Sequence, residues 1–274
     1  TLSSSSAASD VYKRQASEFA NVQKKLGIKR ASLGSLSESV SVFDPEPLKE
    51  IASQLAAQVP AGKGADFSAI HQRITAVDGS VFDTVARVAE LAWMPMAGGK
   101  YKHAYRLHTH FEVLRGVPSC IEVTSANPKG DDDERAVLQR TLESDRCYVT
   151  DRGYAKFSLW NAIVDKGSSY VCRARDNSAY DIVEQRQLSS EDLAEGVLSD
   201  QIVELGQDRK AADRPHHKVR IVIVAETPHT SRGKYSGGST GPSSDGKLRI
   251  ATNLLDVPAE LISKLYLSLI HISE

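Results

Sequence analysis

The stretch Cys147–Ile163 constrains the fold more than any other part of this chain, because it combines a buried strand, an acid and a helix in direct succession. A short run of strand-forming residues ends at Thr150, Asp151 follows at once, and Gly153 opens a turn. From Tyr154 onward, apolar side chains recur at helical spacing. A carboxylate at the carboxyl end of a buried strand is a usual active-site acid in α/β proteins. Aspartate before a helix is equally common as an N-cap. This stretch alone leaves both interpretations open.

Composition limits the classes of protein that the chain can belong to. Its 274 residues, 41% of them hydrophobic, suffice for one large domain or two small ones. The formal net charge is −1, so any nucleic-acid binding must come from local patches. No apolar run approaches the roughly 20 residues that span a bilayer, and we expect no membrane partner. The three cysteines lie in apolar runs without a CxxC pair, which predicts reduced core residues of a cytoplasmic protein.

The two ends of the chain carry an unusual relationship at the level of codons. DVYKRQ near the N-terminus can be encoded by GAT GTG TAT AAG AGA CAG, and the reverse complement of that string translates as LSLIHI, the sequence near the C-terminus. Both strings resemble the translated adapter of a transposon-based sequencing library; a natural inverted repeat is the alternative. We therefore expect residues 1–15 and 267–274 to be foreign to the gene and exclude them from fold reasoning.

Between these ends, the pattern changes from helical to mixed. Residues 16–70 predict an N-terminal helical segment, with the clearest helix over Pro45–Val59. Three strands follow, the first ending its apolar run at Asp78, and we expect Gly79 to turn the chain there. The acidic cluster Asp131–Glu134 indicates a solvated, capped helix start rather than a metal site. The remaining predicted elements are the Asp151 strand, its helix, further strands and a final helix from Val257.

Three strands, a helix, a strand with an aspartate, a helix and another strand form an RNase H-like order. In that order the first and fourth strands are parallel neighbours, so Asp78 and Asp151 would lie about 4.8 Å apart, strand to strand. Two carboxylates at that distance repel each other unless a divalent cation lies between them. Oxygen ligands with open positions suit Mg²⁺ or Mn²⁺. Such ions can activate a water or a 3′-hydroxyl in phosphodiester transfer.

Three motifs resemble the catalytic domain of bacterial insertion-sequence transposases of the DDE class. They are TAVDGS around Asp78, YVTDRGY around Asp151, and the strand-to-helix sequence LRIATNLLDVPAELISKLY that ends at Tyr266. The resemblance implies an RNase H-like mixed sheet with flanking helices over residues 71–266 and a largely β insertion at about 176–247. It makes Asp78 and Asp151 the first two metal ligands, for Mg²⁺ or Mn²⁺. Arg152 could contact phosphate or form a surface salt bridge.

The resemblance also implies a function. A transposase of this class cleaves double-stranded DNA at transposon ends and joins it to target DNA through a 3′-hydroxyl, as a dimer on DNA associated with the bacterial nucleoid. The sequence departs from the family at the third acid, a glutamate seven residues after the tyrosine, because Ser273 stands there. The alternatives are an RNase H-like nuclease or resolvase, and a relic that binds DNA without cutting it.

His108 and His110, on one face of a strand, are expected to be half-exposed.

We predict that the uninterrupted gene continues the final helix after Tyr266 and encodes a glutamate seven residues on. The reason is that the helix pattern AELISKLY stops where the adapter-like string begins. Long-read sequencing of the source locus measures this directly. Finding LSLIHISE in the native genome would contradict the prediction.

Overall fold

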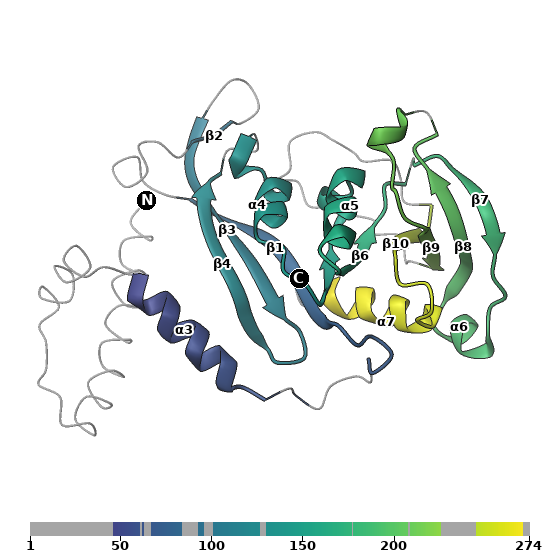
Figure 1. Cartoon of the computed structure of the whole chain (residues 1–274), viewed down its shortest axis with the longest axis horizontal. Helices are drawn as coiled ribbons and strands as arrows, with labels where there is room; N and C mark the ends of the chain where they lie inside the picture. The colour runs from purple at the N-terminus through teal and green to yellow at the C-terminus, as the bar shows by residue number, and fades with distance from the viewer. Residues whose placement is uncertain are drawn as a thin grey trace, which may run out of the picture. The chain divides into compact units, whose positions relative to one another are not determined.

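Ten strands among the described residues form one mixed sheet in the computed structural model (Figure 1). The structure describes residues 46–60, 62, 67–83, 93–95, 101–126, 130–176, 178–207, 209–225 and 245–270. The chain divides into two compact units, 1–55 and 56–274, and the whole sheet belongs to the second. The predicted adapter segment 1–15 and the N-terminal part of the predicted helical segment, residues 16–45, lie outside the described residues.

The strands differ in length and in the neighbours that they pair with. They are β1 (Arg73–Asp83), β2 (Trp93–Pro95), β3 (Tyr101–Glu112), β4 (Val117–Ser125), β5 (Arg146–Thr150), β6 (Ser169–Arg173), β7 (Tyr180–Gln185), β8 (Val197–Leu205), β9 (Val219–Ala225) and β10 (Lys247–Thr252). The α-helices are α3 (Glu46–Gln58), α4 (Glu134–Arg140), α5 (Phe157–Asp165), α6 (Ser190–Ala194) and α7 (Ala259–Ile270). The described residues also form three short 3-10 helices, η2 (Gly130–Asp132), η3 (Arg152–Tyr154) and η4 (Ala211–Asp213).

The strand order confirms the predicted fold class. β4, β3, β1, β5 and β6 are adjacent in that sequence, with β3 and β4 antiparallel and β1, β5 and β6 parallel, which is the RNase H-like arrangement. The largely β insertion consists of β7, β8 and β9, together with the short α6. β10 then lies antiparallel between β6 and β9, so that the insertion extends the same sheet.

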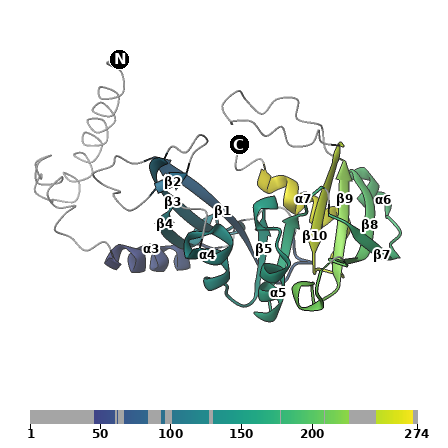
Figure 2. The same cartoon turned by 90° about the horizontal axis from the view of Figure 1, so that it is seen from above.

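Both faces of the sheet are covered by helices, because its central strands carry apolar side chains on both sides. Figure 2 shows α7 on one face and α5 on the other. The α7 face buries Ile74, Cys147, Val149, Val171, Val222, Val224, Leu248 and Ile250 against Ile262, Leu265 and Tyr266 of the helix. The opposite face buries Val77, Tyr148, Tyr170, Cys172, Ile221 and Ala251 against side chains of α4 and α5 such as Leu138, Leu159, Trp160 and Ile163.

Several local expectations are wrong in detail, each for a tertiary reason. The predicted turn at Gly79 does not form, because β3 pairs with β1 as far as Asp83 and holds the backbone extended. The helix after Asp151 does not start at Tyr154; a 3-10 turn comes first and α5 begins at Phe157. α7 begins at Ala259 rather than at Val257, and the amide of Glu260 donates to Asp192 on α6 (2.8 Å).

Two buried arginines tie distant segments together. Arg220 on β9 is 2% exposed and donates to both carboxylate oxygens of Asp200 on β8, at 2.7 and 2.8 Å. Its Nη1 also donates to the carbonyls of Leu254 (2.9 Å) and Val257 (2.5 Å), which lead into α7. The second is Arg146 on β5, whose Nη1 donates to Thr75 of β1 and Glu112 of β3. The β9 arginine therefore fixes where the last helix begins.

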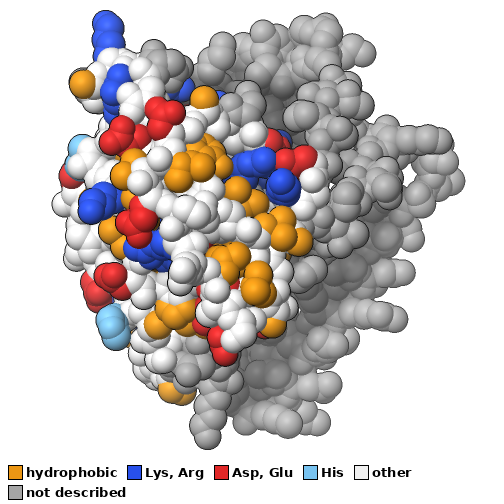
Figure 3. All heavy atoms as spheres, turned by 90° about the vertical axis from the view of Figure 1, so that its right-hand side faces the viewer, with side chains coloured by type: hydrophobic (Ala, Val, Ile, Leu, Met, Phe, Trp, Pro, Cys, Tyr) orange, Lys and Arg blue, Asp and Glu red, His pale blue; other side chains and the backbone are white. Residues whose placement is uncertain are grey.

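The outermost strand, β7, combines exposed apolar side chains with charged ones. Figure 3 views this side of the molecule and shows hydrophobic side chains separated by acidic and basic ones. Ile182 and Val183 are more than half exposed, and the strand has an irregular register between Ile182 and Glu184. Bulges and charges are common devices that discourage edge-to-edge pairing.

Among the described residues, no helix is long and apolar enough to cross a membrane.

Replacing Asp200 by Asn should lower the free energy of unfolding by about 3 kcal/mol, because it leaves the buried Arg220 charge without a counter-charge. Urea titration followed by circular dichroism measures this. Glu184→Gln is the control, since Glu184 pairs with Arg186 at 3.7 Å and is 62% exposed. Equal midpoints for both variants would contradict the assignment of Arg220 and Asp200 as a buried pair.

Candidate active site

Asp78 lies within β1, at the level where its parallel neighbour stops. Its Oδ1 accepts a hydrogen bond from the amide of Gly79 (2.8 Å), and the residue is exposed. β1 pairs with β3 on one side throughout, but its pairing with β5 on the other side ends at Ala76. The carboxylate therefore stands beside an unpaired stretch of β1, open to solvent.

Asp151 directly follows β5 and has the two features that its sequence context predicts. It is the N-cap of η3, with Oδ1 accepting from the amide of Gly153 (2.8 Å). It is also exposed at the carboxyl end of a fully buried strand. The cap uses only one carboxylate oxygen, so the structural role leaves the second oxygen for an external ligand.

The register of β1 and β5 brings the two aspartates together. The last paired residues are Ala76 and Val149, and both aspartates lie two positions further along their strands. Neighbouring strands are about 4.8 Å apart. The backbone positions of Asp78 and Asp151 thus follow the paired stretch at the same level of adjacent strands.

This donor set fits a hard divalent cation but does not complete its coordination. Carboxylate oxygens are the ligands that Mg²⁺ and Mn²⁺ prefer, and Mg²⁺ commonly binds through one or two carboxylates while it keeps several waters. Within the described ranges, no group of three His, Cys, Asp or Glu side chains is placed to hold one ion. Asp78 and Asp151 would supply two ligands, and water or substrate oxygens the others.

A third carboxylate, Glu134, lies next to this pair and was missed by the sequence reasoning. It is the first residue of α4, and it forms an ion pair with Arg106 of β3, whose Nη1 lies 3.0 Å from Oε1 of the glutamate. A Cβ added to Gly79 would lie only 2.9 Å from that oxygen, so the glutamate packs against the backbone next to Asp78. Burial raises the pKa of Glu134, the Arg106 guanidinium lowers it, and the charges of Asp151 and Asp78 raise it.

Tyr154, three residues after Asp151, is a buried side chain. Its side chain is 2% exposed, and its hydroxyl has no hydrogen-bond partner among the described residues. Burial raises the pKa of this phenol, and the charges of Glu134, Asp151 and Asp78 raise it further. A buried hydroxyl within the electrostatic influence of three carboxylates therefore has no acceptor among the described residues.

The other candidate residues from the sequence have structural roles. Arg152 forms the surface salt bridge that was one of its two expected roles, with Nη1 3.3 Å from Asp176. His108 and His110 are each 2% exposed, which corrects the expectation that they are half-exposed. His108 contacts Thr124 at 2.9 Å, and burial lowers the pKa of His110 to about 4. Thr141, the residue after α4, lies 3.4 Å from His110 Nε2, and both histidines are core residues.

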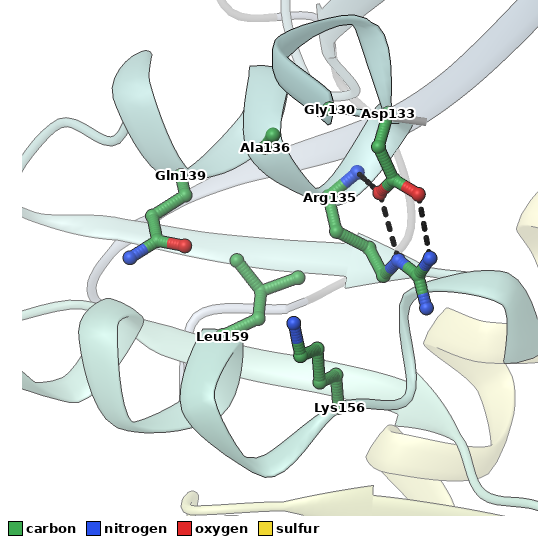
Figure 4. Close-up of a pocket in the computed structure, with 7 residues that line it drawn as sticks. All are labelled: Gly130, Asp133, Arg135, Ala136, Gln139, Lys156 and Leu159. Carbon is green, nitrogen blue, oxygen red and sulfur yellow. Dashed lines mark hydrogen bonds and ion pairs between the residues drawn. The ribbon is translucent and has the colours of Figure 1, made fainter. Parts of the chain in front are cut away.

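A shallow surface hollow of about 230 Å³ lies between α4 and α5. Figure 4 shows Lys156 and Leu159 of the α5 region facing Ala136 and Gln139 of α4. Arg135 lines it too, but its guanidinium is held by Asp133 at 2.8 Å. Asp78 and Asp151 do not line the hollow. It is separate from the candidate active site.

The fold and site define a class: an RNase H-like domain with two aspartates level on its central parallel strands. Residues 70–266 match the family described as "Transposase DDE domain", and the chain belongs to this family. The match includes both aspartates and ends at Tyr266.

Two further similarities to known proteins were found. A curated protein of Sinorhizobium fredii (strain NBRC 101917 / NGR234), named "Putative transposase y4zB", is 28% identical over 106 residues, which cover 36% of this chain and 28% of that protein. Among solved structures, the cryo-EM structure of the piggyBac transposase synaptic complex with hairpin DNA matches with a TM-score of 0.36 and 9% identity. That match covers 73% of this chain and 40% of the other. The chain thus spans less than half the length of either protein.

Substitutions at Asp151 can separate its capping role from its charge. Asp151→Asn should keep the thermal midpoint within about 2 °C of the wild type, because Asn caps as well as Asp. It should nevertheless abolish Mn²⁺ binding measured by electron paramagnetic resonance. Asp151→Ala should lose the cap as well, at a cost of about 1 kcal/mol. Unchanged Mn²⁺ binding in Asp151→Asn would show that the residue only caps the turn.

Proposed function

We propose that this chain contains the catalytic domain of a DNA transposase that cuts double-stranded DNA at transposon ends and transfers the strand by 3′-hydroxyl attack. The observation that carries the proposal is the level placement of Asp78 and Asp151 on β1 and β5, in a domain of the transposase DDE family. Phosphoryl transfer depends largely on positioning and on stabilising charge. Two exposed carboxylates on rigid, buried strands meet the first of these requirements.

The cofactor in this proposal is Mg²⁺ or Mn²⁺, held by Asp78 and Asp151. When bound, such an ion would activate the attacking oxygen and stabilise the leaving one. The chain itself contributes the fixed separation of the two carboxylates. Their Oδ1 atoms are oriented by the amides of Gly79 and Gly153, so each side chain enters the reaction already positioned.

In the family that the sequence resembles, the third acid stands seven residues after the tyrosine, and Ser273 occupies that position here. α7 packs on the sheet face to which Ile74 and, by alternation, Asp78 belong. An acid further along this helix would approach the pair from that side. We propose that the parent protein carries such a glutamate, that it acts as a dimer on DNA near the nucleoid, and that the present chain does not cut DNA as it stands.

Nicking of a plasmid tests this function. The substrate is supercoiled DNA carrying the terminal repeats that flank the gene at its source locus, incubated with Mn²⁺. The chain as printed should give no nicking above background. A chain restored with the native sequences at both ends should nick the plasmid, and Asp78→Asn in that background should reduce cutting at least 10²-fold.

The same assay decides between the alternatives. Cutting without dependence on the terminal repeats would support an RNase H-like nuclease or resolvase. Specific binding to the repeats without any cutting by the restored protein would support a DNA-binding relic. Robust nicking by the printed chain would contradict the proposed incomplete site.

A further inference from the structure

The strand order and the positions of Asp78 and Asp151 do not explain why Glu134 and Tyr154 lie where they do. Glu134 extends from α4 to the backbone of Gly79, where an added Cβ would lie 2.9 Å from its Oε1 and would displace the carboxylate. By alternation along β1, Gly79 faces α4 while Asp78 faces the α7 side. The glutamate therefore approaches the aspartates from the side opposite to α7.

The hydroxyl of Tyr154 is an independent observation that indicates a ligand. Tyr154 lies three residues after Asp151, is 98% buried in its side chain and has no hydrogen-bond partner for its hydroxyl within the described part of the chain. An unpaired buried hydroxyl costs free energy of folding. A water molecule held between this hydroxyl and the nearby carboxylates would satisfy it, and hydrated Mg²⁺ or Mn²⁺ carries such waters.

We propose that Glu134 is a positioning residue of the Asp78–Asp151 site, a third acid that attracts the divalent cation and holds its water ligands from the α4 side, with Tyr154 donating to the same water layer. The proposal rests on the proposed metal-dependent function. Glu134 acts through water because no three acids of the described chain are placed to hold one ion directly. Arg106, 3.0 Å from Glu134, balances its charge in the cation-free protein.

The opposite charges of Glu134 and Arg106 should affect Mn²⁺ affinity in opposite directions, which a purely structural ion pair would not do. Glu134→Gln removes a negative charge near the cation and should weaken Mn²⁺ binding about tenfold, as loss of outer-shell partners does. Arg106→Gln removes the opposing positive charge and should strengthen binding. If the pair only supported the fold, both variants would break the same contact and change binding in the same direction.

Tyr154→Phe provides a second signature. Removing an unpartnered hydroxyl should leave the thermal midpoint unchanged or raise it. It should nevertheless weaken Mn²⁺ binding severalfold, because the water layer loses a donor. A hydroxyl with a purely structural role would not separate stability from metal affinity in this way.

The experiment is a titration of the full printed chain with Mn²⁺, followed by electron paramagnetic resonance of the free ion. The matched control is Glu122→Gln, since Glu122 also pairs with an arginine of the same region, Arg140 at 2.7 Å, and is similarly exposed at 34% against 29% for Glu134. This variant should bind Mn²⁺ like the wild type. Gly79→Ala, which displaces the Glu134 carboxylate without changing any charge, should weaken binding as Glu134→Gln does.

The possible outcomes separate this inference from the proposed function. If the wild type binds Mn²⁺, Asp151→Asn does not and Glu134→Gln binds normally, the metal site stands and the role of Glu134 is wrong. Weakening by both Glu134→Gln and Arg106→Gln would likewise overturn that role. If the wild type binds no Mn²⁺, the metal site itself fails and the inference fails with it.

Discussion

The parallel pairing of β1 with β5 is the constraint on which the rest of this structure depends. It places two acids, 73 residues apart in the sequence, at one level of the sheet. Arg146 secures this pairing at the opposite end of the strands, where it bonds to Thr75 (3.1 Å) and Glu112 (2.9 Å). A slip of β5 by one residue would break the ion pair between the buried side chains of Arg146 and Glu112. The same slip would move Asp151 off the level of Asp78.

The fold class could be predicted from the sequence because the elements that decide it are strongly patterned. Cys147–Thr150 is an apolar run buried on both faces, and the residues after Lys156 repeat at helical spacing. β7 lies within the expected β insertion but was not predicted as an individual strand, because its residues are almost all exposed and an edge strand needs no apolar period. The turn expected at Gly79 failed for a different reason, since long-range pairing with β3 outweighs the local preference of glycine.

The site could be predicted only as far as its backbone determines it. Asp78 and Asp151 follow from strand order, which local sequence reveals. Glu134 was interpreted as part of a solvated helix start, and nothing in the local sequence shows that α4 packs next to Gly79. The burial of His108 and His110 escaped notice for the same reason. The nearest sequence signal for Glu134 is the glycine directly after Asp78, because glycine in a strand marks a position where a neighbouring element can approach closely.

The position of β10 has a consequence for how the protein is made. This strand lies between β6 and β9, yet it is encoded after every other strand. During synthesis, the ribosome releases the core strands and the β7–β9 meander before the strand that joins them. Until residues 247–252 emerge, β6 and β9 each present an open edge of unpaired amides and carbonyls, the kind of surface that other chains can pair with. The nascent chain is therefore most exposed to aggregation just before residues 247–252 emerge, and a chaperone that shields strand edges at that stage would raise its yield most.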